Sequence, residues 1–399
     1  MRDVFNANIA HAYYIPSVGF SSEETFSAAI KKVFPGAVEY DFKSAYNQPH
    51  IKDLQTAQRF LHGGAQTYGV KRFFLEDLRP DTEKAGFCGW CAMLAFFPES
   101  GVLSLSFHYG LENTTTDRLI VLRQSGIVRK YPFTDGEFSC RDLAENICGQ
   151  IGIDFKPAEQ SFLCEITKFG EYEDIALIEK EQANRLYGLL TGDEAYEFVP
   201  DEIVKSRLGC SWGSRSFIKI FAFGQAFLFL NLIGSPRQTE YLAHQEKFGT
   251  AAYGGCDEYF KMGSCPIIAN HGILFSVEFV MMLKALIDNV ITYQSEYDKE
   301  DGGSFYHRIR AIRAFRKKII IVLEKAENTA ISEIGELSSI LLESQHIAPI
   351  VDRVKYLLEI LEGDLDLIYS ERNNILVTIL TIIGLVFAAV QIIIPFFPI

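Results

Sequence analysis

The chain has 399 residues and a formal net charge of −13, with 48% hydrophobic and 22% charged residues. This composition supports well-packed cores and gives no sign of extended disorder. The negative charge argues against a binder of duplex nucleic acid, because neutralising phosphates requires a basic surface. The eight cysteines form no regular framework and therefore predict reduced thiols rather than a disulfide scaffold.

The two tryptophans mark what we interpret as an internal repeat. Trp90 and Trp212 stand in similar sequences, and each is followed by two aromatic and aliphatic runs that a glycine, Gly101 or Gly224, interrupts. Runs of this kind separated by a glycine are typical of β-hairpins. A strand and a helix are predicted before each hairpin, and a helix after it. The alternative is a chance similarity between two hydrophobic hairpins.

The repeat predicts an α+β cytosolic region of two related β-α-β-β-α units. We place the first unit over residues 1–155 and the second over residues 156–265. In the first hairpin, polar and apolar residues alternate along one strand, which indicates a sheet with one polar face. The apolar positions are Leu103, Leu105 and Phe107, and the polar positions are Ser104, Ser106 and His108.

From residue 266 the hydrophobic period becomes helical, which predicts a helical stalk domain over residues 266–374. Its last helix begins near Pro349, because proline suits the first turn of a helix. Apolar residues then follow the spacing of a heptad seam, namely Val354, Leu358, Leu361, Leu365 and Ile368. Such a seam predicts self-association, and we expect a homo-oligomer of four or five chains.

The segment 375–394 contains no charged residue and is followed by the short tail 395–399. At about 1.5 Å per residue, a helix of this length spans roughly 30 Å, the thickness of the hydrocarbon core of a bilayer. The N-terminus lacks the features of a signal peptide, and Lys and Arg residues precede the segment but do not follow it. The sequence therefore predicts one C-terminal transmembrane helix in the inner (cytoplasmic) membrane, with the N-terminal bulk of the chain in the cytoplasm.

Polar and small residues follow one line along this segment. They are Asn374, Thr378, Thr381, Ala388 and Gln391, and the remaining surface is apolar. In lipid, small residues allow helices to approach, and polar residues seek partners or water. A ring of such helices would line a pore with these side chains. The alternative is a passive anchor, in which the same side chains only pack against another helix.

The junction Glu371–Asn374, followed by the apolar segment, resembles the stalk and first membrane helix of CorA-type divalent cation channels. The resemblance covers roughly residues 300–394 and implies a homo-oligomeric funnel. The chain lacks the second membrane helix and the Gly-Met-Asn motif of that family, so magnesium transport is not implied. CorA-like proteins without this motif include membrane effectors of type III CRISPR systems, which are thought to respond to a nucleotide-derived second messenger.

Two groups of residues are candidates for binding an anionic ligand. Near the second tryptophan, glycines, hydroxyls, an aromatic ring and a guanidinium come together in the sequence; the candidates there are Trp212, Ser214 and Arg215. The alternative for this stretch is a loop that leads into a strand. On the second stalk helix, Arg310, Arg313 and Lys317 share one face and would hold phosphates. The alternative for this face is pairing with the acidic stretch 296–301.

Catalytic and metal-binding patterns are weak. Cys88 and Cys91 have the Cys-x-x-Cys spacing, but no second pair accompanies them, which favours structural cysteines. The sequence contains no Walker, dinucleotide-binding or nucleophile-elbow motif, and its histidines show no metal-ligand spacing. We therefore predict no catalytic residue, no metal and no cofactor.

Two functional hypotheses remain. In the first, the chain is a homo-oligomeric CorA-like membrane channel or pore-forming effector, gated by a cytosolic ligand such as a nucleotide second messenger in antiviral defence. In the second, it is a tail-anchored cytosolic enzyme or adaptor whose membrane helix sets only its location. A pore requires several tails around one axis, whereas an anchor works as a monomer.

Overall fold

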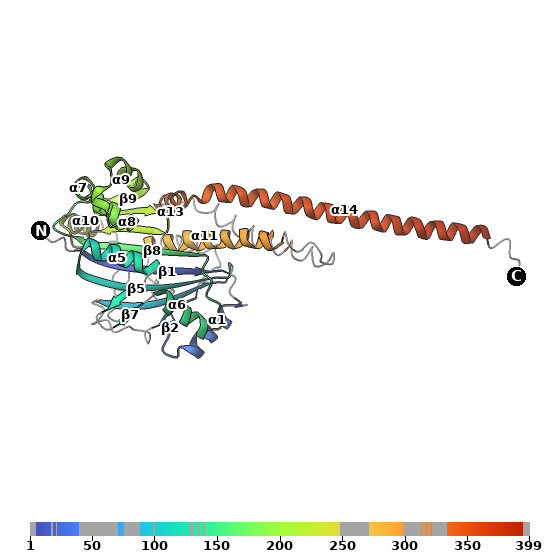
Figure 1. Ribbon diagram of the computed structural model, residues 1–399, viewed down its shortest axis with the longest axis horizontal. Helices are drawn as coiled ribbons and strands as arrows, with labels where there is room; N and C mark the ends of the chain where they lie inside the picture. Colours follow the sequence, from blue (N-terminus) through green and yellow to red (C-terminus); the bar gives the residue numbers. More distant parts are fainter. Residues whose placement is uncertain are drawn as a thin grey trace.

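The computed structural model describes residues 5–16, 19–20, 22–39, 71–75, 88–98, 100–127, 131–133, 136–138, 140–247, 271–297, 313, 316–317, 320 and 333–393. Within these residues the chain forms one nine-stranded mixed sheet with helices on both faces, and one long helix that leaves the sheet (Figure 1). A separate two-stranded sheet pairs β6 (Tyr131–Phe133) with β7 (Gly136–Phe138).

The order of the large sheet is β2-β3-β4-β5-β1-β8-β11-β10-β9. Its central strands β1 and β8 pair antiparallel, with Ala12 opposite Ser161. β8 and β11 pair parallel, and the other neighbours pair antiparallel. The strands are β1 (Phe5–Ile15), β2 (Val38–Glu39), β3 (Lys71–Leu75), β4 (Gly89–Phe97), β5 (Val102–Thr114), β8 (Glu159–Phe169), β9 (Ser211–Arg215), β10 (Ile218–Phe223) and β11 (Ala226–Asn231).

This architecture is α/β, so the predicted α+β class of two β-α-β-β-α units is wrong. The two halves share one sheet, joined at the β1–β8 pair. The hairpins at Gly101 and Gly224 are confirmed, with φ of +65° and +55°. Trp90, however, lies within its hairpin, on β4, whereas Trp212 lies on β9, one strand before its hairpin. The similar sequences around the two tryptophans therefore lie on strands that have different positions relative to their hairpins.

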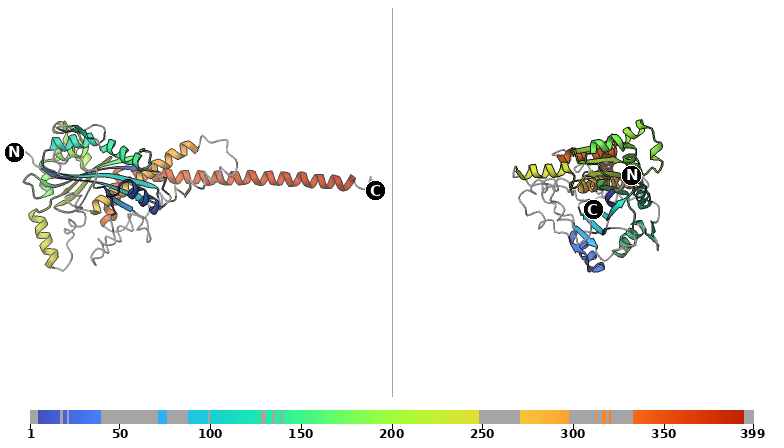
Figure 2. Two further views of the ribbon diagram at one scale, coloured as in Figure 1. Left: turned by 90° about the horizontal axis from the view of Figure 1, so that it is seen from below. Right: turned by 90° about the vertical axis from the view of Figure 1, so that its left-hand side faces the viewer.

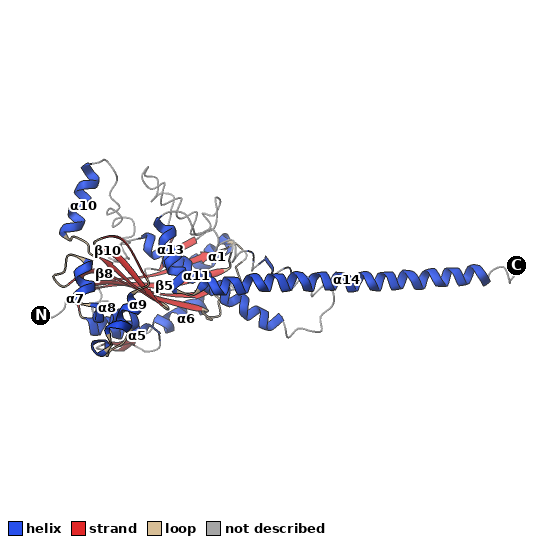
Figure 3. Cartoon of the chain, turned by 90° about the horizontal axis from the view of Figure 1, so that it is seen from above, coloured by secondary structure: helices blue, strands red, loops and turns tan. Residues whose placement is uncertain are grey.

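Alternation along the strands divides the core between the two faces of the sheet. Ile9 and Tyr13 of β1 belong to the core on one face, and Ala10, Ala12 and Tyr14 belong to the core on the other. The first face is covered by α1 (Glu23–Val33), α5 (Thr116–Ile127), α6 (Cys140–Gln150), α7 (Ile175–Glu181) and α8 (Ala183–Thr191). The second face is covered by α11 (His271–Tyr297), α13 (Glu333–Ser344) and the start of α14 (Ile347–Ile393), as Figure 3 shows from another side. Two further helices, α9 (Asp201–Leu208) and α10 (Pro236–Lys247), flank β9–β11.

Helix ends follow local sequence signals. Ser22 caps α1: its hydroxyl accepts from the Thr25 amide, and the Thr25 hydroxyl accepts from the Ser22 amide. Asp174 caps α7 by accepting from the Ala176 amide at 2.8 Å. These short-range bonds fix where each helix begins and therefore which of its faces meets the sheet.

The alternation predicted for β5 is confirmed, but its polar face does not meet solvent. Ser104, Ser106 and His108 are at most 3% exposed, because α11 packs over this side of the sheet. A buried ion pair between Arg72 of β3 and Glu278 of α11 lies on the same side. The polar residues thus form a buried layer between sheet and helix.

The last helix, α14, continues past Pro349 as predicted and projects away from the sheet (Figures 1 and 2). Its first turns are anchored by Ile347, Val351 and Val354, which are at most 9% exposed. Every described side chain from Lys355 to Leu385 is exposed. The side chains of Leu358, Leu361, Leu365 and Ile368, the rest of the expected heptad seam, lie outside the described residues.

Across the residues that the structure describes, no helix combines the length and the apolar character that crossing a membrane requires. The predictions of a transmembrane helix over 375–394, of a membrane channel and of an inner-membrane location are therefore wrong on this finding. The described apolar side chains run from Ile375 to Leu385, about 17 Å of helix, or roughly half the thickness of a hydrocarbon core. The side chains of the rest of the expected span lie outside the described residues.

Candidate functional site

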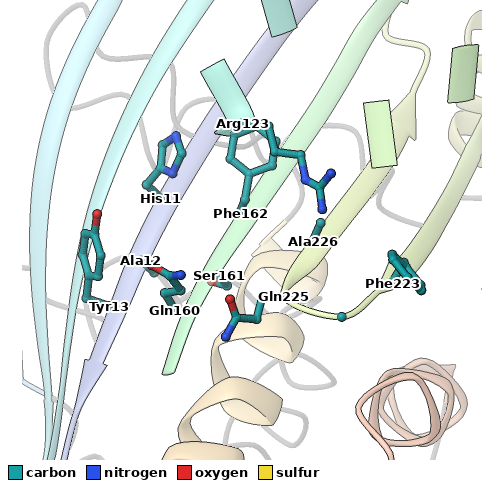
Figure 4. Close-up of a pocket in the computed structure, with 11 residues that line it drawn as sticks. His11, Ala12, Tyr13, Arg123, Gln160, Ser161, Phe162, Phe223, Gln225 and Ala226 are labelled. Carbon is teal, nitrogen blue, oxygen red and sulfur yellow. The ribbon is translucent and has the colours of Figure 1, made fainter. Parts of the chain in front are cut away.

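A pocket of about 140 Å³ lies at one end of the central strands, on the side of the sheet that α5 covers (Figure 4). Strands β1 and β8 form its floor, the β10–β11 turn forms one edge, and α5 contributes an arginine. The side chains that matter below are His11, Tyr13, Arg123, Gln160, Phe162, Phe223 and Gln225. The pocket therefore draws on both halves of the chain.

Arg123 is the only cation among the residues that line this pocket. It follows Leu119, Ile120 and Leu122 on α5, all buried, and is itself 9% exposed. Its Nε is buried without a hydrogen-bond partner, and none of the described carboxylates forms an ion pair with it. Burial lowers the pKa of Arg123 to about 10, so the group stays charged at neutral pH. In Figure 4 its side chain reaches over the pocket toward Ala226.

Gly192 makes room for this guanidinium. It ends α8 in a left-handed conformation, with φ of +76°. A Cβ at this position would stand 2.5 Å from Nη1 of Arg123, closer than real Cβ contacts allow. Glycine suits this left-handed backbone, and a side chain here would require the guanidinium of Arg123 to shift.

The opposite wall of the pocket is aromatic and uncharged. His11 is 3% exposed, its Nε2 lies 2.9 Å from the Tyr109 hydroxyl, and its ring contacts Phe162 at 4.8 Å between centroids. Burial lowers the pKa of His11 to about 3, because the charged imidazolium would lose its hydration. At neutral pH His11 is therefore a neutral member of the wall, and Arg123 remains the single charge.

The β10–β11 turn links this pocket to a charged cluster on the α11 side of the sheet. The backbone carbonyl of Gln225 accepts from the Phe162 amide at 2.9 Å, and its Nε2 donates to Glu159 Oε2 at 2.9 Å. Glu159 Oε1 also pairs with Lys284 of α11 at 3.0 Å. Burial, a hydrogen bond to Glu159 and the charge of Glu159 raise the pKa of Asp288 to about 7, although Lys284 opposes the shift.

The raised pKa of Asp288 predicts a stability change with pH. Between its ordinary value of 3.8 and about 7 the folded state holds a proton that the unfolded state has released, so stability falls as pH rises through this window. We expect Asp288→Asn to raise the free energy of unfolding at pH 8 by about 1–2 kcal/mol, a figure reduced for partial solvent screening. At pH 5 the substitution should have little effect.

Urea denaturation of the wild type and of Asp288→Asn at pH 5 and pH 8 measures this difference. The exposed Asp352, replaced by asparagine, is the control and should leave both values unchanged. Equal effects of Asp288→Asn at the two pH values would contradict the assignment.

The candidate residues around the second tryptophan do not reach the pocket. Trp212, Ser214 and Arg215 lie on β9, the edge strand of the sheet, rather than in a glycine-rich loop. Arg215 is exposed, and its guanidinium lies 5.3 Å from the ring centroid of Tyr241. The side chain of Ser214 lies outside the described residues. The stretch therefore forms an edge strand, whereas both interpretations weighed from the sequence assumed a loop.

Of the basic candidates of the stalk, Arg313 contacts α14. Arg313 Nη2 donates to the Tyr369 hydroxyl at 3.2 Å, and the neighbouring Arg316 pairs with Glu362 at 3.1 Å. Lys317 is exposed, and Arg310 lies outside the described residues. Arg313 and Arg316 thus contact α14, and the side chains of the acidic stretch 296–301, which we weighed as their partner, lie outside the described residues.

The candidate pore residues fall on α14. Asn374, Thr378 and Thr381 are exposed. The hydroxyls of the two threonines donate to backbone carbonyls one turn earlier, each at 2.8 Å. The side chains of Ala388 and Gln391 lie outside the described residues. The described members of the line therefore use their hydroxyls within their own helix.

Sequence reasoning missed Arg123 and His11. A signal for Arg123 existed: it stands three and four residues after Ile120 and Leu119, on the face that α5 turns to the core. A lone arginine on an apolar helix face is a stronger indication of an anion site than a run of exposed cations. His11 lies within a strand of mixed small and aromatic residues, and no pattern distinguishes it.

No family model, curated protein or solved structure matches this chain. The resemblance to CorA-type channels therefore remains an untested prediction. Among the described residues, no group of three or more His, Cys, Asp or Glu side chains is placed to hold a metal ion. The pocket has to be interpreted from its own chemistry.

Proposed function

We propose that this protein is a binding protein for a small anionic molecule, and that the pocket beneath α5 is its binding site. The observation that carries the proposal is Arg123: a guanidinium that is 9% exposed, lines a cavity, and has no carboxylate partner among the described residues. A buried charge without a partner costs several kcal/mol. A bound anion would offset this cost and give the folded protein its missing counter-charge.

The size and walls of the pocket favour a compact anion. A cavity of comparable volume holds one benzene-sized molecule. A guanidinium binds carboxylate and phosphate oxygens in pairs, and the amide side chains of Gln160 and Gln225 add further hydrogen-bonding groups. The aromatic wall of Tyr13, Phe162 and Phe223 suits a flat ring. A small aromatic carboxylate, or the phosphate end of a nucleotide messenger, fits these requirements.

Calorimetry with inorganic phosphate, benzoate, AMP and cyclic oligoadenylates tests the proposal. For the anion that binds, Arg123→Leu should weaken affinity by roughly 30- to 150-fold, the loss of about 2–3 kcal/mol expected for charge-assisted hydrogen bonds. In the absence of ligand the same variant should be more stable than the wild type, because an unpaired buried charge has been removed.

Arg118→Leu provides the matched control. Arg118 lies on the same helix but is exposed, so its loss removes the same charge without touching the pocket. We expect unchanged binding. Equal weakening by the two variants would indicate a general charge effect, and failure of all four probes to bind the wild type would reject the proposed function.

We also propose that the protein acts as a homo-oligomer of four or five chains assembled through α14. Large apolar side chains from Ile375 to Leu385 are 45–66% exposed, and monomeric proteins rarely leave so large an apolar surface uncovered. The double variant Leu376→Glu/Leu380→Glu should reduce the mass measured by light scattering to that of one chain. Phe198→Glu, at an exposed apolar position far from α14 in sequence, should leave the mass unchanged. A wild-type monomer, or a monomer that binds lipid vesicles instead of its own copies, would contradict self-assembly.

A further inference from the structure

The β10–β11 turn touches two parts of the molecule at once. Gly224 and Gln225 line the pocket, and the carbonyl oxygen of Gly224 accepts a hydrogen bond from Nε2 of Gln345. Gln345 is 5% exposed and stands between the end of α13 at Ser344 and the start of α14 at Ile347. One peptide unit thus joins the edge of the pocket to the corner from which α14 leaves.

The corner itself has an unusual backbone. His346 has φ of +52°, in the left-handed region that residues other than glycine rarely adopt. Its amide donates to the Glu343 carbonyl at 2.9 Å, and the amide of the neighbouring Gln345 donates to the Leu341 carbonyl at 3.2 Å. These two bonds hold the backbone of the corner. Beyond it, the described side chains of α14 that are buried end at Val354. Among the described residues, α14 contacts α11 and α13 and is bonded by Arg313 and Arg316, and the link from Gly224 acts at its base.

A second route leads from the same turn to α11. Gln225 Nε2 donates to Glu159, and Glu159 pairs with Lys284 of α11. The helix α11 packs against both α13 and α14. A change in the position of Gln225 would therefore reach the base of α14 from two sides.

We infer that the β10–β11 turn couples the pocket to the α13–α14 corner, so that an anion bound beside Arg123 fixes the corner and with it the direction of α14. The inference rests on the proposed anion binding and adds its regulatory consequence. About 58 Å of helix extends beyond Val354, so a tilt of about 5° at the corner moves the far end by about 5 Å. Binding of an anion in the pocket would therefore move the apolar surface of α14 through which we propose that the chains assemble.

Hydrogen exchange of the full chain tests the coupling without any ligand. Gln225→Ala alters the turn from the pocket side, and we expect the amides of residues 341–354 to exchange about tenfold faster. Gln345→Ala removes the hydrogen bond from the corner to the same turn and should have a similar effect. Because the two variants break different routes from the same turn, the double variant should exchange at least as fast as the faster single variant.

Gly101→Ala is the control for a general loosening of the sheet, because it disturbs the turn of another hairpin. Gly101 occupies the turn of the other hairpin, with φ of +65°, and is not among the residues that line the pocket described above. It should leave residues 341–354 unchanged. Unchanged exchange at residues 341–354 in Gln225→Ala and in Gln345→Ala would overturn the coupling.

Saturating inorganic phosphate or benzoate, whichever binds, gives the second measurement. We expect slower exchange at residues 341–354 in the wild type and less slowing in Gln345→Ala, although the latter still binds the anion. Binding without slowing in the wild type would reject the coupling and leave the proposed function intact. Absence of binding, with the effect of Gln225→Ala present, would reject the proposed function alone.

Discussion

Replacing Arg72 with methionine should destabilise the folded protein by about 3–5 kcal/mol, the largest effect that we expect from a single substitution. Arg72 and Glu278 form a paired contact between β3 and α11: Nη1 donates to Oε1 at 3.0 Å and Nη2 donates to Oε2. Their side chains are 0% and 5% exposed. Removing the cation would leave the Glu278 carboxylate buried without its counter-charge. Urea denaturation at pH 7 measures the change.

The double variant Arg72→Met/Glu278→Leu is the decisive comparison. It removes both charges, so no uncompensated carboxylate remains, and apolar neighbours such as Met93 and Phe97 can pack against the new side chains. We expect its stability to lie within about 1 kcal/mol of the wild type or above it. If the double variant is as unstable as Arg72→Met, the loss comes from packing rather than from the unpaired charge.

This ion pair also shows what the sequence can and cannot predict. The hairpin turns were predictable, because Gly101 and Gly224 adopt backbone angles that glycine tolerates best. The pairing of Arg72 with Glu278 was not, since 206 positions separate them and no local period relates a strand to a helix that far along the chain. The sequence predicted two related units over 1–155 and 156–265, but for the same reason it could not predict the contact of β1 with β8 that places their strands in one sheet.

The choice of candidate site residues depended on local sequence in the same way. We selected cations by their clustering and by nearby glycines, and such cations are exposed: Arg215 lies beside Tyr241, and Arg313 lies along α14. The cation on which our proposed binding site rests, Arg123, is instead a single one that the fold desolvates. Desolvation depends on how α5 and α8 pack, and Gly192 acts on Arg123 from 69 positions away. The spacing of the apolar residues around Arg123 is the one part of this arrangement that the sequence contains.

Two buried histidines should make the fold sensitive to acid. His11 and His108 are at most 3% exposed, and burial lowers the pKa of each from 6.5 to about 3, with the positive charge of Arg72 adding to the shift of His108. Below pH 6.5 the unfolded state binds protons that the folded state does not, so stability falls as pH falls toward 3. At pH 5 each histidine should cost about 2 kcal/mol relative to pH 7.

Asp288 opposes this slope in the wild type, because its raised pKa stabilises the folded state as pH falls from about 7 toward 4. The contribution of the histidines is therefore best measured in the Asp288→Asn background, where the loss of stability between pH 7 and pH 5 should be larger than in the wild type. Adding His11→Phe or His108→Leu to this background should reduce that loss by about 2 kcal/mol each, and by roughly twice as much together. Denaturation curves at the two pH values provide the measurement. His244→Phe, at a site that is less buried on α10, should change nothing, and an unchanged loss in the His11 and His108 variants would show that these imidazoles take up protons without unfolding.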